Sequence, residues 1–586
     1  MLLRRGIVGV CAVGLLASMV GVAQAVESKK YPVYVVKSEG LSVPDTEKIL
    51  SSLAPKMDDG SVVQIGSHTR FFSRSSMESG TRAVADPQGI GQPGQDDEKG
   101  APVNGAEWDV DYLRSAPLVS VDDASDLLSK AFSGVNLGDS RVAFASSYTT
   151  LEIVGSGQTA PIFEGPIRTV TSRESSLSGL PVVGPGQSAT VNFGSDGRVA
   201  SLSIDVRRIA KTKKQVDVPV GAEAVRACRA AVGGNIKGAK FSARPVYLVS
   251  DQAAPGDSIP PVMECRMFGA GVLPWIFYID LTLFNLIFSL PPGLNIEDAP
   301  GGLFEGRTTA GAYLSLAANP PLPNTGSETD GWNSTMARGG VPVNATVDRD
   351  NRIERQWLES SPGSPAVVDQ VDLAYVDTHG YASGLQLNSG SSPSTAFLSN
   401  TRDWKLGQQD LEFLVLSACQ VLKDDAASGR PEWRDRVGPA FGGLHMMFGA
   451  DTDVWDTTVL GWRMAELVTG VYHGAMQCRE PTEEEIRQWE MTGGTWSVRP
   501  RPGTYCEAFR ELTRGWEPGY FPIQWAYIEA FQIAQWGDED NPVRGAIVGT
   551  EGSAGIGGTA MDCLMCNLPD QDYTAGANLW RLEFSA

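Results

Sequence analysis

The 586-residue sequence predicts an α/β protein with a mostly parallel sheet flanked by helices in its C-terminal half. After residue 366, short apolar runs alternate with stretches of helical spacing, a pattern that favours parallel strands joined by helices. A smaller α+β domain is expected over 118–270, where helical patterns are interspersed with extended segments and turn signals. The length is enough for about three domains.

The first 25 residues are typical of a secretory signal. Arg4 and Arg5 precede an apolar stretch of signal length, and Ala23-Gln24-Ala25 is a suitable cleavage site. A membrane anchor is the alternative, but the stretch is short and rich in Gly and Ala. We therefore expect an exported protein, secreted or held in the periplasm or at the cell surface.

The charge balance excludes some partners. A formal net charge of −21 argues against nucleic acid and against anionic membrane surfaces. A later apolar run at 271–292 contains Asp280 and Asn285, and an aspartate is costly inside a bilayer. This run therefore predicts buried strands, and no membrane span is expected once the signal is removed.

Residues 26–117 form an N-terminal segment in which we expect a strand at 31–37 and a helix at 46–57. Residues 76–105 are rich in Gly, Pro, Asp and Gln, which predicts a linker or mobile loop. In the following domain, Ser120 and Asp123 form a capping pattern at the start of a helix over 120–132.

Further along this domain, Ser195-Asp196-Gly197 predicts the turn of a hairpin over 188–206. The remaining elements expected there are a helix at 221–233 and strands at 243–250 and 259–267. Residues 271–365 read as a connecting region that is loop-rich from 293. In the C-terminal domain, 366–586, the expected strands are 371–377, 412–418, 444–450 and 545–550, and the expected helices are 455–476 and 523–536.

Seven cysteines remain after the signal, so at least one thiol is left over in an oxidising compartment. Pairing by sequence neighbourhood joins Cys228 with Cys265, Cys478 with Cys506, and Cys563 with Cys566. Cys419 is then the odd one, although sequence alone does not determine connectivity. The final pair could instead be a redox or metal pair, but no second such motif or nearby histidine completes a zinc site.

Two motifs follow apolar runs in the C-terminal domain. His379-Gly380 comes after 371–377, and Ala418-Cys419 comes after the run that begins at 412. In a parallel sheet, both motifs emerge at the carboxyl ends of strands, where ligands bind. A thiolate nucleophile, an imidazole base and main-chain N–H donors for an oxyanion would then lie together.

These motifs resemble a known superfamily. "VDLAYVDTHG" and "LEFLVLSACQ" are similar to the signature blocks of caspase-like cysteine peptidases, which include caspases, legumains, gingipains and CHAT-type domains. The resemblance implies a caspase-like sheet, His379 as the catalytic histidine, Cys419 as the nucleophile, and the Gly380 and Cys419 amides as the oxyanion hole. It implies a polypeptide substrate and requires no cofactor or metal. The architecture also resembles a group of exported bacterial proteins that lack an assigned substrate.

Other features qualify the resemblance. Related domains commonly carry a glycine shortly after the cysteine, whereas Gln420 follows it here. Asp377 has the strand parity of His379 and is a candidate orienting residue, with a solvated strand-end carboxylate as the alternative. "SGLPVVGPGQSATVNFGSDGRV", beginning at Ser178, resembles propeptide-type domains of secreted peptidases, which would allow intramolecular inhibition by the N-terminal region.

Other interpretations remain open. The fold could serve as a catalytically inactive binding or scaffolding protein, or the dyad could belong to an acyltransferase or amidase. Among the competing histidines, His445 reads as a core imidazole, His473 as a helix end, and His68 as part of the N-terminal segment.

Overall fold

The structure is a computed structural model that describes residues between 28 and 586. Several stretches lie outside the described residues, the longest being 1–27, 84–105, 287–309, 344–357, 471–520 and 552–577. The expected signal therefore lies outside the described residues, and so do the ends of four expected elements, 221–233, 243–250, 455–476 and 523–536. So do Cys478, Cys506, Cys563 and Cys566, which leaves two of the expected disulfides as predictions.

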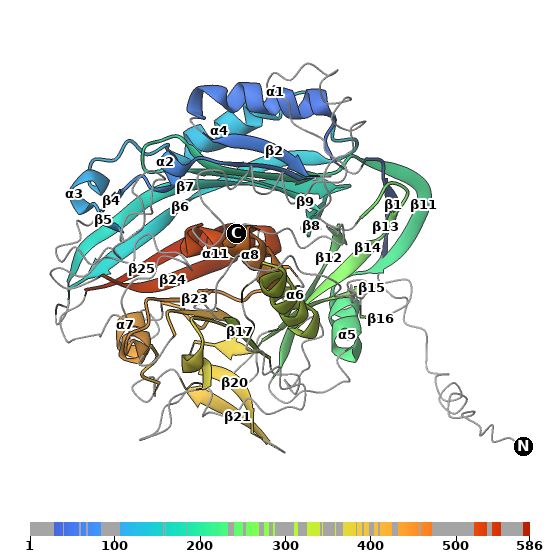
Figure 1. The fold of residues 1–586 in the computed structure, drawn as a ribbon. Helices are drawn as coiled ribbons and strands as arrows, with labels where there is room; N and C mark the ends of the chain where they lie inside the picture. The colour runs from blue at the N-terminus through green and yellow to red at the C-terminus, as the bar shows by residue number, and fades with distance from the viewer. Residues whose placement is uncertain are drawn as a thin grey trace, which may run out of the picture.

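One large mixed sheet runs through both halves of the chain (Figure 1). Its main ladder follows the order β2 (Ser61–Ile65), β3 (His68–Phe72), β10 (Val199–Val206), β9 (Gln187–Phe193), β7 (Pro161–Leu177), β6 (Arg141–Val154), β25 (Asn578–Ser585), β24 (Arg544–Glu551), β23 (Met446–Ala450), β22 (Phe413–Ser417), β18 (Leu373–Asp377) and β17 (Ala310–Leu314). The N-terminal and C-terminal halves are joined where β6 pairs with β25.

The ladder branches at β7. Beside its pairing with β9, β7 pairs further along with β8 (Leu180–Val183). From β8 the branch continues through β12 (Lys240–Leu248), β14 (Pro261–Phe268), β15 (Trp275–Asp280) and β16 (Asn285–Leu286). β15 and β16 bear out the expectation of strands within the apolar run.

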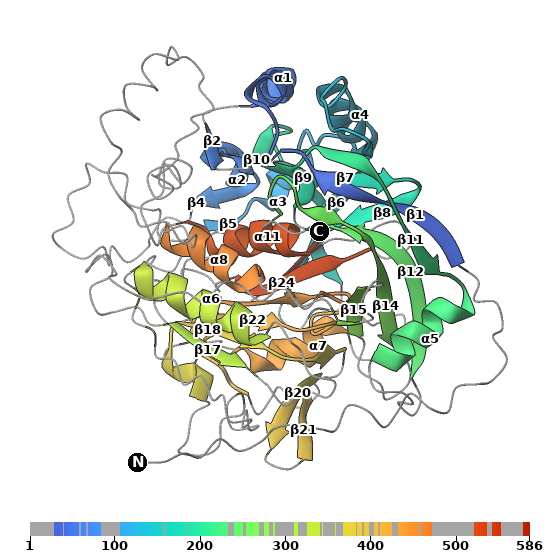
Figure 2. The ribbon, with the colours of Figure 1, turned by 90° about the vertical axis from the view of Figure 1, so that its right-hand side faces the viewer.

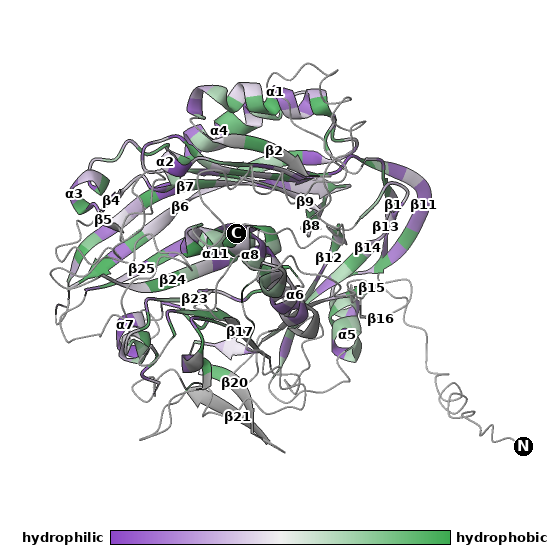
Figure 3. Cartoon of the chain, viewed as in Figure 1, coloured by the Kyte–Doolittle hydropathy of each residue, from purple (hydrophilic) through white to green (hydrophobic). Residues whose placement is uncertain are grey.

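Smaller sheets complete the strands that the structure describes. β1 (Ser28–Val36) pairs with β11 (Ile209–Pro219) and β13 (Ser258–Ile259), β4 (Thr81–Ala83) pairs with β5 (Ala106–Trp108), and β19 (Gly380–Tyr381), β20 (Gly384–Ser389) and β21 (Ser392–Phe397) form a third group. β11 is hydrophilic along its middle, Lys211–Gln215, and apolar residues lie toward its two ends (Figure 3).

The expectation of a mostly parallel sheet in the C-terminal half holds for only part of that sheet. β17, β18, β22 and β23 are parallel neighbours, but β24 runs antiparallel to β23, and β25 antiparallel to β24. Most pairings of the large sheet are antiparallel. The apolar run at 545–550 identified a strand, but a hydrophobic run carries no information about strand direction.

The described helices lie on both sides of the curved sheet. They are α1 (Val43–Leu53), α2 (Arg74–Met77), α3 (Val110–Leu113), α4 (Val121–Ala131), α5 (Ala222–Ala231), α6 (Thr325–Arg338), α7 (Trp433–Val437), α8 (Leu460–Thr469) and α11 (Ile523–Ala534). α1 and α4 cover the outer face of the N-terminal strands, while α8 and α11 lie between these strands and the C-terminal ones (Figure 2). Every residue of α8 and α11 is buried.

Local signals explain several elements. Ser120 caps α4, since its Oγ accepts a hydrogen bond from the Asp123 N–H at 3.1 Å. Gly197 has φ +73° in the turn between β9 and β10, which confirms the predicted hairpin. Residues 76–83 of the expected linker form part of α2 and β4, and Met77 is buried there.

Helix α6 lies in the region expected to be loop-rich. Its sequence is rich in Gly, Ser and Thr, which are weak helix formers. Tertiary contacts override this weakness, because Trp332 stacks on Tyr375 with ring centroids 4.8 Å apart and a Cβ on Gly331 would lie 3.1 Å from the Trp462 side chain.

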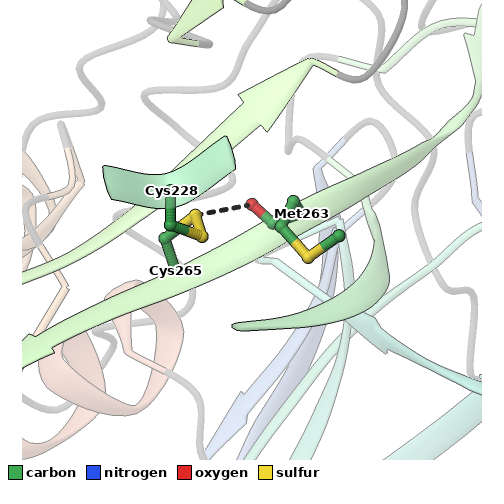
Figure 4. Close-up of a disulfide and its surroundings, with 3 residues drawn as sticks. All are labelled: Cys228, Met263 and Cys265. Carbon is green, nitrogen blue, oxygen red and sulfur yellow. Dashed lines mark hydrogen bonds between the residues drawn. A yellow bond between two sulfur atoms is a disulfide. The ribbon is translucent and has the colours of Figure 1, made fainter. Parts of the chain in front are cut away.

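The predicted Cys228–Cys265 disulfide joins α5 to β14 (Figure 4), with Cα atoms 5.6 Å apart. The Cys265 sulfur also lies 3.9 Å from the Met263 carbonyl oxygen. A disulfide sulfur carries no proton, so this is a contact rather than a donated hydrogen bond. Within the described residues, no helix is both long and apolar enough to cross a bilayer.

Candidate functional site

The two predicted motifs lie side by side at the carboxyl ends of β18 and β22. These strands are parallel neighbours, and Asp377 lies opposite Ser417 in their register. His379 lies two residues after Asp377, and Cys419 lies two residues after Ser417. The Thr378 N–H donates a hydrogen bond to the Ser417 carbonyl oxygen at 3.2 Å, which extends the alignment past the strand ends. The apolar strand pattern therefore brings His379 and Cys419 to one edge of the sheet.

At Gly380, the main chain of the first motif packs closely against the second motif. A Cβ at this position would lie 2.5 Å from the Cys419 carbonyl oxygen and 2.8 Å from the Ala418 Cβ. No side chain fits there, because real Cβ atoms do not approach neighbours this closely. The glycine after the histidine is thus required for the main chain of Gly380 to pack against that of Cys419.

Cys419 is a buried thiol, with 8% of the residue exposed, and His379 is 2% exposed. The Val454 N–H donates to the Cys419 Sγ at 3.4 Å, and the Sγ lies 3.7 Å from the Val454 carbonyl oxygen. A main-chain segment at 451–455, which follows β23, therefore covers the sulfur. Sequence reasoning missed this segment, because its contacts link residues far apart in the chain.

Several contacts hold the 451–455 segment in place. At one end, the Asp451 carboxylate pairs with Arg581 at 2.7 Å and with Arg544 at 2.8 Å. At the other end, the Trp455 N–H donates to the Gln535 Oε1 at 2.7 Å, and the Gln535 Nε2 donates to the Trp455 carbonyl oxygen at 3.1 Å. The cover over Cys419 is therefore fixed by β24, β25 and the end of α11.

Gln420, which directly follows Cys419, has an unusual backbone conformation. Its φ is +56°, in the left-handed region that favours glycine. The Gln420 Nε2 donates to the Asp453 Oδ1 at 2.6 Å, and its main-chain N–H donates to the Thr452 carbonyl oxygen at 2.9 Å. These contacts tie the turn after Cys419 to the 451–455 segment.

Asp377 is 3% exposed, which excludes the solvated alternative. It shares a strand face with Tyr375, whose hydroxyl donates to the Glu328 Oε1 at 2.5 Å. Burial, with the nearby Glu328 and Asp377 charges, raises the pKa of Tyr375 well above its usual value. Asp377 is thus part of a buried polar group beneath the site, and its role in orienting His379 stays a prediction.

The other histidines occupy different places. His445 is fully buried before β23 with its ring edge-on to Phe413, as expected for a core imidazole. His68 lies in β3 and contacts Asp205 at 3.0 Å. Burial lowers the pKa of His68. In the described part of the chain, no group of three or more His, Cys, Asp or Glu side chains is placed to hold a metal ion.

The fold and this strand-end site define the chain as an α/β protein with adjacent histidine and cysteine residues at one sheet edge. Residues 311–554 match a family model described as a Domain of unknown function (DUF6345). The match begins at β17 and includes both His379 and Cys419, so the chain is similar to that family over its C-terminal half. No curated protein matches the chain.

Proposed function

We propose that this chain is an exported, caspase-like cysteine hydrolase that cleaves polypeptides. The observation that carries the proposal is the parallel register of β18 and β22, in which His379 and Cys419 follow matched strand ends and Gly380 packs on Cys419. The order of the two blocks and their parallel strands agree with the caspase-like resemblance. The Cys228–Cys265 disulfide agrees with export to an oxidising compartment.

In the proposed reaction, the Cys419 thiolate attacks the scissile carbonyl carbon and forms a tetrahedral oxyanion. The main-chain N–H groups of Gly380 and Cys419 would stabilise the negative oxygen. His379, having taken the thiol proton, donates it to the leaving amine as the C–N bond breaks and a thioester forms. Water then hydrolyses the thioester, which releases the acid and restores the thiol.

The test is alkylation of the native full-length protein with iodoacetamide, followed by peptide mapping. We expect Cys419 to be modified in the folded state, and we expect His379→Ala to slow the modification by about tenfold or more. His445→Gln is the matched control, because His445 lies at the opposite end of its strand from the site. Labelling that requires unfolding, or that is unchanged in His379→Ala, would overturn the assignment.

The burial of both side chains favours a second candidate. With Cys419 8% and His379 2% exposed, a substrate carbonyl reaches the sulfur only if the 451–455 segment moves. A binding or scaffolding protein that keeps the fold without catalysis would need no such movement. The alkylation experiment separates the two, since only the hydrolase requires a reactive thiol.

We also propose that the region before residue 300 restrains the site. Tyr278 of β15 stacks on Trp455, with ring centroids 5.0 Å apart and planes inclined by 17°. Trp455 follows Val454, whose amide contacts the sulfur. Tyr278→Ala is therefore expected to raise the Cys419 alkylation rate severalfold, whereas an unchanged rate would remove the support for restraint through this contact.

A further inference from the structure

A cavity lies at the branch point of the sheet. β7 pairs with β9 through Thr169–Ser172 and with β8 from Ser175 onward, so Arg173 and Glu174 lie at the fork between the two partners. A cavity of about 350 Å³ occupies this place. Its lining includes residues of β6, β7, β8 and β9, and also Gln532 and Gln535 at the end of α11. It therefore lies at the junction of the two halves, a common position for ligand sites.

Arg173 gives this cavity an unusual chemical character. The residue is 8% exposed, and its Nη1 donates to the Gln187 main-chain oxygen at 2.8 Å and to the Gln187 Oε1 at 2.7 Å. Its Nε and Nη2 are buried and have no hydrogen-bond partner among the described residues. Both nitrogens are closed to the cavity as well as to solvent, so a ligand there would meet the charge of the guanidinium rather than its paired N–H groups.

No described carboxylate neutralises Arg173. It forms no ion pair, and burial alone lowers its pKa to about 9. A buried guanidinium without a counter-charge is costly, and an anion in the cavity that Arg173 lines would offset that cost. Arg70 of β3 differs: burial and the Arg463 charge lower its pKa to about 10, but the charges of Asp205, Glu529 and Glu466 oppose that fall.

We propose that the fork cavity binds a small organic monocarboxylate, with Arg173 as the counter-charge of its carboxylate group. Glu174 also lines the cavity, which disfavours a doubly charged phosphate beside one buried cation. Ala143, Val182 and Val183 line it as well and would contact an apolar tail. The site is separate from the Cys419 sulfur, and the proposal does not depend on the proposed hydrolase activity.

The test is isothermal titration of the full-length protein with acetate, hexanoate and benzoate, with inorganic phosphate as the comparison anion at equal ionic strength. We expect saturable binding of hexanoate or benzoate that is tighter than that of phosphate. Arg173→Gln removes the charge but keeps a hydrogen-bond donor, and is expected to weaken binding by about tenfold or more.

Arg208→Gln is the matched control, because Arg208 is an exposed arginine that does not line the cavity. It is expected to change the affinity by less than about threefold, since an exposed charge is screened by solvent. An absence of saturable carboxylate binding, or equal weakening by Arg208→Gln and Arg173→Gln, would overturn the proposal. Tighter Arg173-dependent binding of phosphate would overturn the choice of a carboxylate.

Discussion

Gly380 and Gln420 show at the residue scale how main-chain geometry shapes the candidate site. Gly380 allows two chain segments to touch where any side chain would intervene. Gln420 adopts a left-handed backbone that glycine would accept at lower cost, and its side chain contacts Asp453 instead. Strained positions of this kind cluster at functional sites.

Gly380→Ala is expected to lower the free energy of unfolding by about 1–3 kcal/mol, because the new methyl group overlaps the Cys419 carbonyl oxygen. Urea denaturation measures the change. Gly165→Ala is the control, since a Cβ there meets only ordinary contact at 3.4 Å and should shift stability by less than about 1 kcal/mol. Equal effects of the two substitutions would contradict the close approach.

Gln420→Gly and Gln420→Ala separate backbone strain from the side-chain contact. Both variants lose the hydrogen bond to Asp453, but only glycine relaxes the φ of +56°. We expect the glycine variant to be more stable than the alanine variant by about 1 kcal/mol. If the alanine variant proves equally stable in urea denaturation, the backbone at this position is not strained.

At the scale of elements, local patterns were sufficient where one segment determines its own structure. Examples are the Ser120 cap of α4, the turn at Gly197 and the apolar runs of β18 and β22. Their parallel pairing was expected because apolar runs alternate with helical stretches in this region, so the adjacency of His379 and Cys419 could be predicted. The direction of β24 and the helix α6 could not, because they depend on partners elsewhere in the chain.

The cover over Cys419 was beyond sequence reasoning for the same reason. Gln535 lies 80 residues from Trp455 in the sequence, and no motif around either residue predicts the two hydrogen bonds between them. The fork cavity likewise arises only because β8 and β9 diverge from a single long strand. Long-range pairing, rather than local propensity, decides these features.

Gln535→Leu tests whether α11 holds the cover in place. Losing both hydrogen bonds to Trp455 should loosen the 451–455 segment and raise the Cys419 alkylation rate severalfold. Gln532→Leu is the control one helical turn away, because Gln532 contacts Asn192 and Ser585 instead. A rate that rises equally in both variants would indicate general loosening of α11 rather than release of the segment.

At the scale of the whole molecule, a buried polar contact joins the two halves. Glu529 of α11 accepts hydrogen bonds from Ser201 of β10 and from the Asn192 Nδ2 of β9 at 3.0 Å. Burial raises the pKa of Glu529 to about 7, although these hydrogen bonds and the Arg70 charge oppose the rise. The junction between the halves therefore contains a group that titrates near neutral pH.

This raised pKa predicts a pH dependence of stability. Since the folded chain holds the Glu529 proton more tightly than the unfolded chain, stability is expected to fall as pH rises from about 4.5 to about 7, by on the order of 3 kcal/mol. His68 has the opposite effect. Its pKa is lower in the folded chain than the value of about 6.5 in the unfolded chain, so it reduces stability as pH falls below about 6.5.

Glu529→Gln isolates the first effect, since glutamine still accepts both hydrogen bonds but does not titrate. Urea denaturation at pH 5.5 and pH 8 is expected to show a smaller loss of stability for the variant than for the parent chain. Parallel pH profiles for the two proteins would mean that Glu529 does not titrate in this window.

The β6–β25 ladder has a consequence for any proteolytic processing of this protein. Leu579–Glu583 of β25 pair with Thr150–Val154 of β6, so a peptide-bond cut at 287–309 would leave the two fragments hydrogen-bonded along a shared strand edge. Such a nicked molecule should migrate as one particle in a native gel and as two bands after denaturation. Maturation by cleavage would thus yield a non-covalent heterodimer, whose fragments separate only on unfolding.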